Sequence, residues 1–448
     1  MKEHTDSLGR IPQELEQFMM GSSTSLLIKG APGTGKTTLA LEILRLMSEE
    51  AKCHYFSTRS SIKRLKEQFP WIKRELSERI WFEPIDARLG TPQHLITIAT
   101  RILKEVGGCL VFDSWDSISD ELSPKERNKV ERTLVSIADS CGAKIVFVSE
   151  NLGGRSLEYL SDGIVTLRQI WFFGSGKRPY ARIRRRSARE IELEKLRGVP
   201  IYQRNYLFTL YRGRFTCIPP YRPARVQASP PEEAAPDLND WYMSTGIREL
   251  DEACRGLPRG RLFLVEVGGR VGIRCYPLLF EMIWNVVLSG RGALMLSSLI
   301  PIPEFLKGIR EHEGSREFKR VGSFKQIFLS QTYEETAVSY VREYERLRRI
   351  HKEVIEFIDL NALESRFGPR KAISFLLDAA SRAFESRVPV VLIAREGIAS
   401  LDVASRLSSA HIALDDLNGA LVLYGISPRS RLYGLIVVKG RHSLIDLM

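Results

Sequence analysis

The feature that most restricts the fold of this chain is a glycine-rich loop between an apolar run and a helical pattern. Residues Ser25–Lys29 are mostly apolar and are typical of a buried strand. Residues Lys36–Glu50 carry leucine and isoleucine at helical spacing. The loop between them fits G-x-x-x-x-G-K-[S/T] and reads Gly30-Ala31-Pro32-Gly33-Thr34-Gly35-Lys36-Thr37. A strand that turns through such a loop into a helix indicates an α/β fold.

Loops of this pattern bind the phosphates of a nucleotide. Their glycines let backbone N–H groups point inward, and the helix N-terminus adds its dipole. Lys36 is expected to reach the β- and γ-phosphates and to act in catalysis, and the Thr37 hydroxyl is expected to ligate Mg²⁺. Asp113 ends the apolar run Cys109–Phe112 and is predicted to hold the Mg²⁺ water shell. The predicted ATP-binding residues are Gly30, Ala31, Pro32, Gly33, Thr34, Gly35, Lys36, Thr37 and Thr38.

Short apolar runs alternate with helical stretches in both halves of the chain. This alternation predicts βαβ units, with a parallel sheet and helices on both faces. After Asp162, residues 189–197 and 202–215 are typical of antiparallel edge strands. Residues 218–240 contain six prolines, which favour an extended linker. The predicted organisation is an ATP-binding domain at 1–218, a proline-rich linker at 219–240 and a second α/β domain at 241–448.

The first half resembles the KaiC/RadA branch of the RecA-like ATPases. The P-loop spacing, the pair Asp113-Ser114 and the segment Glu194-Lys195-Leu196-Arg197-Gly198, which is similar to the family's K-x-R-G motif, carry the resemblance. It implies tandem RecA-like three-layer α/β domains with mostly parallel central sheets. It also implies a homo-oligomer in which Lys195 and Arg197 reach the neighbouring subunit's nucleotide site as catalytic cations. A solvated, charged edge strand is the alternative for these two residues.

The second half resembles the same family more weakly. Residues 244–251 and 256–260 are similar to the family's STGI-x-ELD and GLP-x-G lead-in. In the loop that follows, Val267, Ile273 and Arg274 take the positions of the first glycine, the lysine and the threonine. We therefore expect a degenerate domain that lacks the Walker A lysine and binds no Mg-ATP tightly. Asp359 is interpreted as a relic of the Mg²⁺-binding acid.

The first half departs from the family at the position of the general base. KaiC-type proteins carry glutamate after the strand that follows the P-loop helix, but here that strand, His54–Ser57, leads into Thr58-Arg59. Neither side chain takes a proton from water at neutral pH. Asp116 and Glu150 are the candidate substitutes. We expect firm ATP binding and slow, Mg²⁺-dependent hydrolysis.

The net charge of +12 is concentrated in one segment. Residues 168–225 hold fifteen Lys and Arg against three acids, so the rest of the chain is neutral overall. Interleaved aromatics and the arginines Arg182, Arg184, Arg185 and Arg186 are typical of nucleic-acid binding. An arginine cluster also suits an acidic protein partner, a subunit contact or a solvated face. These alternatives stay open.

The two-domain layout with basic runs late in the first domain is similar to the archaeal gas-vesicle regulators of the GvpD family. This resemblance implies a nucleotide-dependent regulator, with transcription as one target. The alternative is a RadA-like, DNA-stimulated ATPase of repair or recombination. Six cysteines without a CxxC pair, an N-terminus without an apolar region and the lack of a long apolar run predict a cytoplasmic protein that does not enter membranes.

Overall fold

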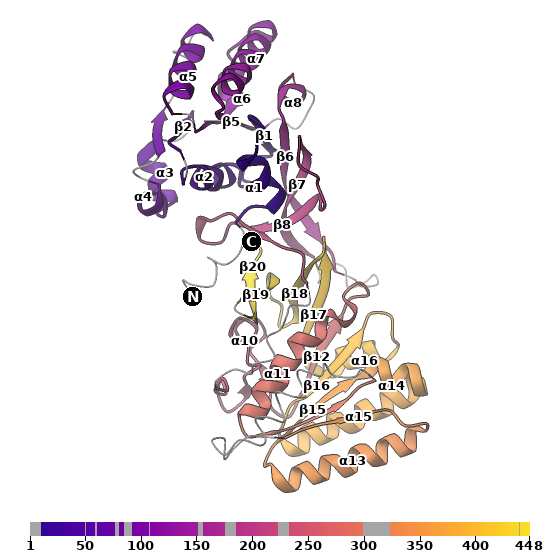
Figure 1. Ribbon diagram of the computed structural model, residues 1–448. Coiled ribbons are helices and arrows are strands. Elements are labelled where there is room, and N and C mark those ends of the chain that lie inside the picture. Colours follow the sequence, from indigo (N-terminus) through magenta and orange to yellow (C-terminus); the bar gives the residue numbers. More distant parts are fainter. Residues whose placement is uncertain are drawn as a thin grey trace. The chain divides into compact units, whose positions relative to one another are not determined.

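The computed structural model describes residues 10–49, 51–58, 61–76, 80–84, 92–106, 108–150, 156–174, 185–222, 233–298, 323–438 and 440–448. The contacts divide the chain into two compact units, whose elements are labelled in Figure 1. The first unit comprises residues 1–171, 187–219 and 447–448, and the second comprises 172–186 and 220–446. Within the described residues, no helix has the length and apolarity that a bilayer span requires.

The first unit is built on a nine-stranded sheet in the order β3-β2-β4-β5-β1-β6-β7-β8-β9. Its strands are β1 (Ser25–Gly30), β2 (Cys53–Ser57), β3 (Ile80–Pro84), β4 (Cys109–Asp113), β5 (Lys144–Ser149), β6 (Gly163–Phe172), β7 (Arg186–Leu196), β8 (Asn205–Thr209) and β9 (Thr216–Ile218). The six strands from β3 to β6 are paired in parallel, and β7, β8 and β9 are antiparallel.

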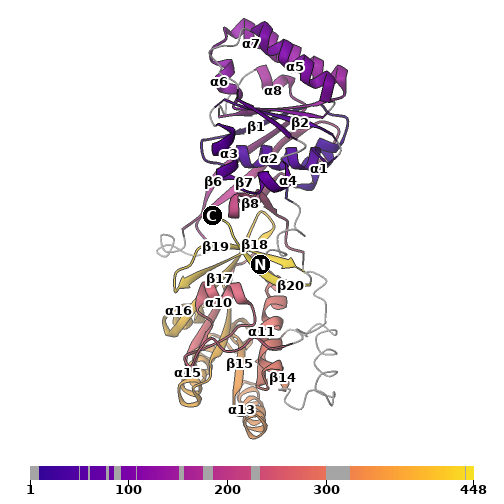
Figure 2. The same cartoon turned by 90° about the vertical axis from the view of Figure 1, so that its left-hand side faces the viewer.

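Helices cover both faces of this sheet, as Figures 1 and 2 show. They are α1 (Gln13–Met20), α2 (Lys36–Met47), α3 (Ile62–Gln68), α4 (Ile72–Glu75), α5 (Pro92–Val106), α6 (Trp115–Ser119), α7 (Pro124–Cys141) and α8 (Ser156–Leu160), with a 3₁₀ turn at Tyr211–Gly213. Side chains of β1 alternate between the two faces, as a strand requires. Leu26 and Ile28 pack with α1 and α2, whereas Leu27 packs with α5, α6 and α7. The unit therefore has three layers, helices–sheet–helices.

The second unit repeats this arrangement with a sheet in the order β14-β13-β15-β16-β12-β17-β18-β19-β20. Its strands are β12 (Leu262–Val267), β13 (Gly292–Leu296), β14 (Phe324–Ile327), β15 (Val354–Asp359), β16 (Val390–Arg395), β17 (Ser408–Leu417), β18 (Ala420–Ser427), β19 (Leu432–Val438) and β20 (Arg441–Asp446), beside the small ribbon β10 (Tyr242–Met243) and β11 (Leu257–Pro258). Pairing is parallel from β14 to β17 and antiparallel from β17 to β20.

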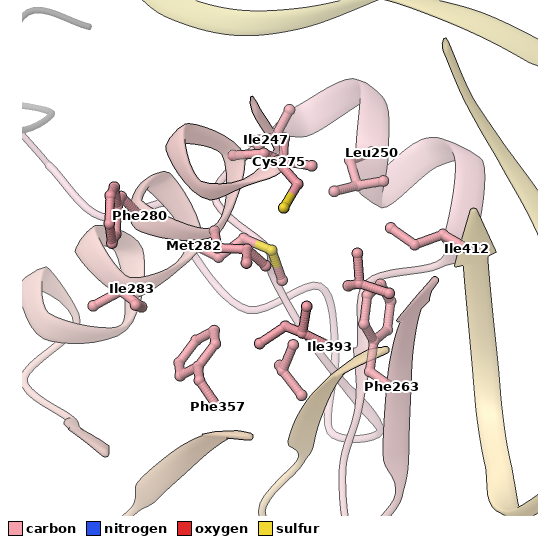
Figure 3. Close-up of a cluster of buried hydrophobic side chains, with 14 of the residues drawn as sticks. Ile247, Leu250, Phe263, Cys275, Phe280, Met282, Ile283, Phe357, Ile393 and Ile412 are labelled. Atoms are coloured by element: carbon pink, nitrogen blue, oxygen red, sulfur yellow. The ribbon is translucent and has the colours of Figure 1, made fainter. Parts of the chain in front are cut away.

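The helices of the second unit also lie on both faces of its sheet. They are α10 (Arg248–Cys254), α11 (Tyr276–Leu288), α13 (Tyr333–Ile350), α14 (Leu360–Phe367), α15 (Pro369–Ser386) and α16 (Ser400–Leu407), with a 3₁₀ turn at Gly272–Cys275. One core joins α10 and α11 to the sheet, where Phe280 and Met282 of α11 gather with Phe263 and Phe357 of the strands (Figure 3). The other core joins α13, α14, α15 and α16 to the opposite face. The predicted fold class, tandem RecA-like α/β domains with mostly parallel sheets, is confirmed.

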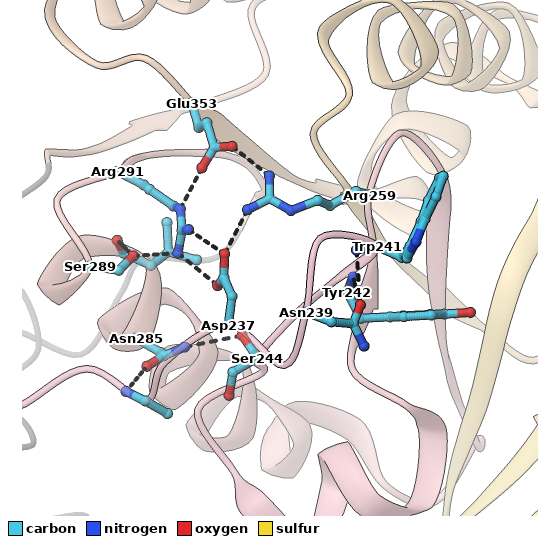
Figure 4. A network of polar contacts seen from close by, with 12 residues as sticks. Asp237, Asn239, Trp241, Tyr242, Ser244, Arg259, Asn285, Ser289, Arg291 and Glu353 are labelled. Carbon is cyan, nitrogen blue, oxygen red and sulfur yellow. Dashed lines mark hydrogen bonds and ion pairs between the residues drawn. The ribbon is translucent and has the colours of Figure 1, made fainter.

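An ion-pair network fastens the start of the second unit to its sheet (Figure 4). Arg259 and Arg291 each bind both Asp237 and Glu353, at N–O distances of 2.5–2.6 Å. All four side chains are about four-fifths buried. Each of the four side chains therefore contacts two side chains of opposite charge. Partly buried ion pairs stabilise a fold when the partners are paired and hydrogen-bonded in this way.

One predicted element is wrong in detail. Residues 202–215, expected as one edge strand, form β8, the 3₁₀ turn at Tyr211–Gly213 and the approach to β9. Arg212 and Gly213 both have positive φ there, at 59° and 71°, and a strand cannot continue through two left-handed residues. The antiparallel order of β7, β8 and β9 agrees with the expectation for this region.

Candidate nucleotide site

The glycine-rich loop connects the end of β1 directly to the start of α2. Gly33 and Gly35 have φ angles of 79° and 104°, a region that strains residues with a side chain. A Cβ on Gly35 would also lie 3.0 Å from the Leu210 side chain. The Thr34 hydroxyl donates to the Ala31 carbonyl at 2.8 Å and closes the loop. The sequence therefore folds here into the tight turn that a phosphate-binding loop needs.

Lys36 lies buried at the N-terminus of α2. Its ammonium donates to the carbonyl oxygens of Gly30 at 2.7 Å and Ala31 at 3.0 Å, and it lies 4.0 Å from Glu150 Oε1. The charge is thus held against the loop itself, within reach of any phosphate that the loop amides bind.

Thr37 and Asp113 are brought together from α2 and β4. The Thr37 hydroxyl donates to Asp113 Oδ2 at 2.6 Å, and the buried Tyr55 hydroxyl of β2 donates to the same oxygen at 2.5 Å. Burial, followed by the charge of Asp113, raises the pKa of Tyr55 well above its ordinary value, so Tyr55 stays a donor. A hydroxyl and a carboxylate beside a phosphate loop are hard oxygen donors of the kind that Mg²⁺ takes. The donor set therefore fits Mg-ATP: Thr37 and Asp113 would hold the metal, and bound Mg²⁺ would neutralise phosphate charge.

Thr58, at the position where the family carries glutamate, and the candidate base Asp116 both make structural hydrogen bonds. The Thr58 hydroxyl accepts from Ser114 N at 3.0 Å and so holds the residue after Asp113. Asp116, at the start of α6, accepts from the Ser149 hydroxyl at 2.9 Å and from Glu150 N. Arg59 lies outside the described residues.

Glu150 is the one of these candidates that lies beside the P-loop lysine. It is the first residue after β5, and β5 lies between β1 and β4 in the sheet. The sequence indicated Glu150 as a candidate base but did not show that it lies near the P-loop. Tyr55 was missed altogether, because a buried tyrosine in an apolar strand is ordinarily a core residue.

Lys195 and Arg197 lie at the other end of β1 from the loop. Lys195 donates to the Ser161 carbonyl at 2.6 Å, and Arg197 pairs with Asp162 at 2.7 Å. Asp162 also accepts from Thr24 N, at the start of β1. Burial alone would raise the pKa of Asp162, but the hydrogen bonds from Thr24 and Ser25 and the charge of Arg197 lower it. Neither cation reaches the P-loop of its own chain, and their role at a neighbouring subunit stays a prediction.

The corresponding loop of the second unit is closed by its own side chains. Arg274 donates to the Arg270 carbonyl at 2.6 Å and pairs with Asp416 at 2.7 Å, while Ile273 is 65% exposed. Asp359, at the end of β15, caps α14 by accepting from Asn361 N and also accepts from the Tyr276 hydroxyl at 3.1 Å. Asp359, which the sequence suggested as a relic of the Mg²⁺-binding acid, therefore acts as a helix cap in this structure.

The described part of the arginine run contains one exposed and one buried side chain. Arg185 is exposed, whereas Arg186 is buried and donates to the carbonyls of Gly425 at 2.8 Å and Ser430 at 2.7 Å. The Arg186 guanidinium also stands 5.3 Å from the ring centre of Tyr424. Arg182 and Arg184 lie outside the described residues.

Comparison with known proteins finds similarity in the loop-bearing half of the chain. The family model "GvpD gas vesicle protein, P-loop domain" matches residues 15–83 and 95–178, a span that includes the loop, Tyr55, Asp113 and Glu150. The first half of the chain is therefore similar to the P-loop domain of the GvpD gas vesicle proteins. Two curated relatives come from Halobacterium salinarum (strain ATCC 700922 / JCM 11081 / NRC-1). Protein GvpD2 is 26% identical over 489 aligned positions, covering 96% of this chain and 94% of the relative. Protein GvpD1 is 29% identical over 288 positions, covering 59% of this chain and 52% of the relative.

The likeness to GvpD2 extends through the second unit as well as the first. It therefore includes Lys195, Arg197 and the region of the degenerate loop, which the family model does not match. The similarity to GvpD2 thus covers both units, whereas the similarity to the P-loop family model covers only part of the first unit.

Proposed function

We propose that this chain is a GvpD-like regulator that binds Mg-ATP at the loop of its first unit and hydrolyses it slowly. The observation that carries the proposal is the convergence of Lys36 with the bonded pair Thr37–Asp113 at the end of β1. Slow turnover is expected because Thr58 stands where the family carries its glutamate, and because the candidate base Asp116 is used in structural hydrogen bonds.

The similarity to gas vesicle proteins supports a role in gas-vesicle control. We propose that ATP acts as a regulatory ligand. Its binding to the first unit would change which partner the protein contacts and would thereby control transcription. The degenerate second unit supports this role over that of a motor with two catalytic domains, because its loop lysine is replaced by Ile273.

We further propose that ATP promotes a homo-oligomer in which Lys195 and Arg197 approach the nucleotide of the next subunit. Arg197 is 65% exposed and follows the end of β7, at the end of β1 opposite the loop, which supports action on a neighbour. A cation at the γ-phosphate stabilises the charge that develops there during hydrolysis.

An acidic regulatory protein or a second subunit is the preferred partner of the arginine run that contains Arg185. The burial of Arg186 leaves Arg182, Arg184 and Arg185 as the side chains to test. If these three bind DNA phosphates, replacing them by Ala should reduce the slope of log affinity against log salt by about three. The preferred role predicts an unchanged slope and a lost partner or assembly, measured by gel shift at two salt concentrations and by light scattering.

The most informative experiment measures phosphate release from ATP by the full chain alone, with single-stranded DNA and with duplex DNA. The proposal expects slow release that DNA changes less than threefold. Stimulation of tenfold or more by either DNA would favour the RadA-like alternative. A protein that does not bind Mg-ATP at all would contradict both.

A further inference from the structure

Glu150 lies at the carboxyl edge of the first sheet, between the P-loop and Asp113. Strand β5 is paired with β1 on one side and with β4 on the other. The C-terminal end of β5 therefore lies between the P-loop, which follows β1, and Asp113, which ends β4. In a parallel sheet, ligands bind at this carboxyl edge. Glu150 is the first residue beyond it.

The backbone of Glu150 is fixed, and its carboxylate stays within reach of water. Asp116 accepts from both Glu150 N and the neighbouring Ser149 hydroxyl, which anchors the end of β5 to α6. Asp116 is itself buried. The Glu150 side chain is 26% exposed, and its Oε1 lies 4.0 Å from the Lys36 ammonium. A held backbone with a partly exposed carboxylate suits a group that exchanges a proton.

The position of Lys36 indicates where Glu150 would lie when ATP is bound. A P-loop lysine contacts the β- and γ-phosphates, so a carboxylate near its ammonium lies beside the γ-phosphate. Direct contact between a carboxylate and a phosphate oxygen is repulsive at neutral pH. A water molecule between them relieves the repulsion, and that water lies where a nucleophile for the γ-phosphorus is needed.

We infer that Glu150 is the general base for ATP hydrolysis in this chain. The inference rests on the proposed function. The water oxygen forms a bond to the γ-phosphorus, and the bond from the γ-phosphorus to the β–γ bridging oxygen breaks. The water proton passes to a Glu150 carboxylate oxygen and then to solvent, leaving ADP and inorganic phosphate. The base comes from the strand between β1 and β4, and not from the residue after β2, where Thr58 stands.

The test compares E150Q with the wild-type full chain in Mg-ATP affinity and in phosphate release. Glutamine keeps the shape of the side chain and removes its basicity. We expect an unchanged affinity, within threefold, and a fall in turnover of at least 100-fold, the usual scale of a lost general base. E150D should retain more turnover than E150Q, and the acidic limb of the wild-type pH–rate profile should disappear in E150Q. E121Q removes an exposed carboxylate of the same type in the same unit and should change neither quantity.

Three results would overturn the inference. E150Q turnover within threefold of wild type would mean that another group takes the proton. A parallel loss of ATP affinity and turnover would mean that Glu150 only positions Lys36. Wild-type protein that binds Mg-ATP but releases no phosphate above the uncatalysed rate would remove the catalytic role and leave ATP binding intact. Failure of the wild type to bind Mg-ATP is the distinct result that contradicts the proposed function itself.

Discussion

Tyr55 and Asp113 are joined by a 2.5 Å hydrogen bond in which the buried phenol donates to carboxylate Oδ2. The same oxygen accepts from Thr37 at 2.6 Å, so hydrogen bonds from β2 and α2 converge on one carboxylate oxygen of β4. Such partners behind a metal-binding carboxylate fix its orientation. Tyr55 thereby links the apolar core of the first unit to the proposed Mg²⁺ site.

Tyr55→Phe is expected to raise the Mg²⁺ concentration for half-maximal ATP binding about tenfold, because Asp113 loses an orienting partner. The measurement is a titration of Mg²⁺ into protein with a fluorescent ATP analogue. Tyr206→Phe is the matched control, since it removes another buried phenol, bonded to Glu14 in the same unit. Both variants should lose about 1 kcal/mol of stability, but only the first should shift the Mg²⁺ midpoint. Equal midpoints would show that Tyr55 serves the core alone.

The sequence predicted the elements whose chemistry is local. The strand–loop–helix around Lys36 follows from glycine spacing and apolar periodicity, and Asp113 follows from the apolar run before it. The repeat of the sheet in the second half was also predicted, because β12 is followed by a glycine-containing loop and a helical pattern as β1 is, although the loop lacks the lysine and threonine of the first. Local signals of this kind need no knowledge of what packs against them.

The remaining features depend on contacts between distant segments. Tyr55 and Glu150 become part of the site only because β2 and β5 are neighbours of β4 in the sheet. In the sequence, Arg186 resembles the other arginines of a basic run. In the structure it is buried and donates to two carbonyls that lie more than 230 positions away in the chain. The sequence indicates charge and periodicity, whereas the strand order and the burial of one arginine among several depend on tertiary packing.

Arg197→Ala and Lys36→Ala should each hydrolyse ATP poorly, for different reasons. If Arg197 acts on a neighbouring subunit, an equimolar mixture contains interfaces with an intact loop from one chain and an intact arginine from the other. The mixture should then release phosphate faster than the average of the two separate variants. Arg204→Ala is the control, because Arg204 is also 65% exposed and ion-paired. A mixture no faster than the average would contradict action between subunits.

Arg186→Ala should destabilise the second unit by about 2 kcal/mol, because the buried carbonyl of Gly425 and the half-buried carbonyl of Ser430 lose a charged donor. Urea unfolding followed by tryptophan fluorescence measures the change. Arg185→Ala removes the adjacent exposed arginine and should alter stability by less than about 0.5 kcal/mol. Similar losses in both variants would mean that the run acts through its total charge and not through the contacts of Arg186.

Glu353 should make the stability of the second unit depend on pH. Burial favours its neutral form, but hydrogen bonds from Arg259 and Arg291 outweigh burial and lower its pKa below the ordinary 4.5. A lowered pKa means that this stabilisation is present above pH 4.5 and is lost as the pH falls through the lower, folded-state value. Glu353→Gln should therefore cost about 2 kcal/mol at pH 7 and progressively less below pH 4.

The control for that prediction is Glu334→Gln. Glu334 is exposed and pairs with Lys371 at 2.7 Å, so its replacement should leave stability almost unchanged at every pH. Denaturant midpoints measured between pH 3 and pH 7 test both variants. A Glu353→Gln deficit that stays constant over this range would show that the network acts by packing and not by charge.

The most direct test of the account is a calorimetric titration of Mg-ATP into the full chain and into Lys36→Ala. Among the described residues, the glycine-rich loop of the first unit carries Lys36, whereas the corresponding loop of the second unit has Ile273 in its place and is closed by Arg274 and Asp416. The account predicts one Mg-ATP per chain and an affinity at least tenfold weaker in Lys36→Ala, about 1.4 kcal/mol. An unchanged affinity in Lys36→Ala, or two equivalent sites per chain, would contradict it.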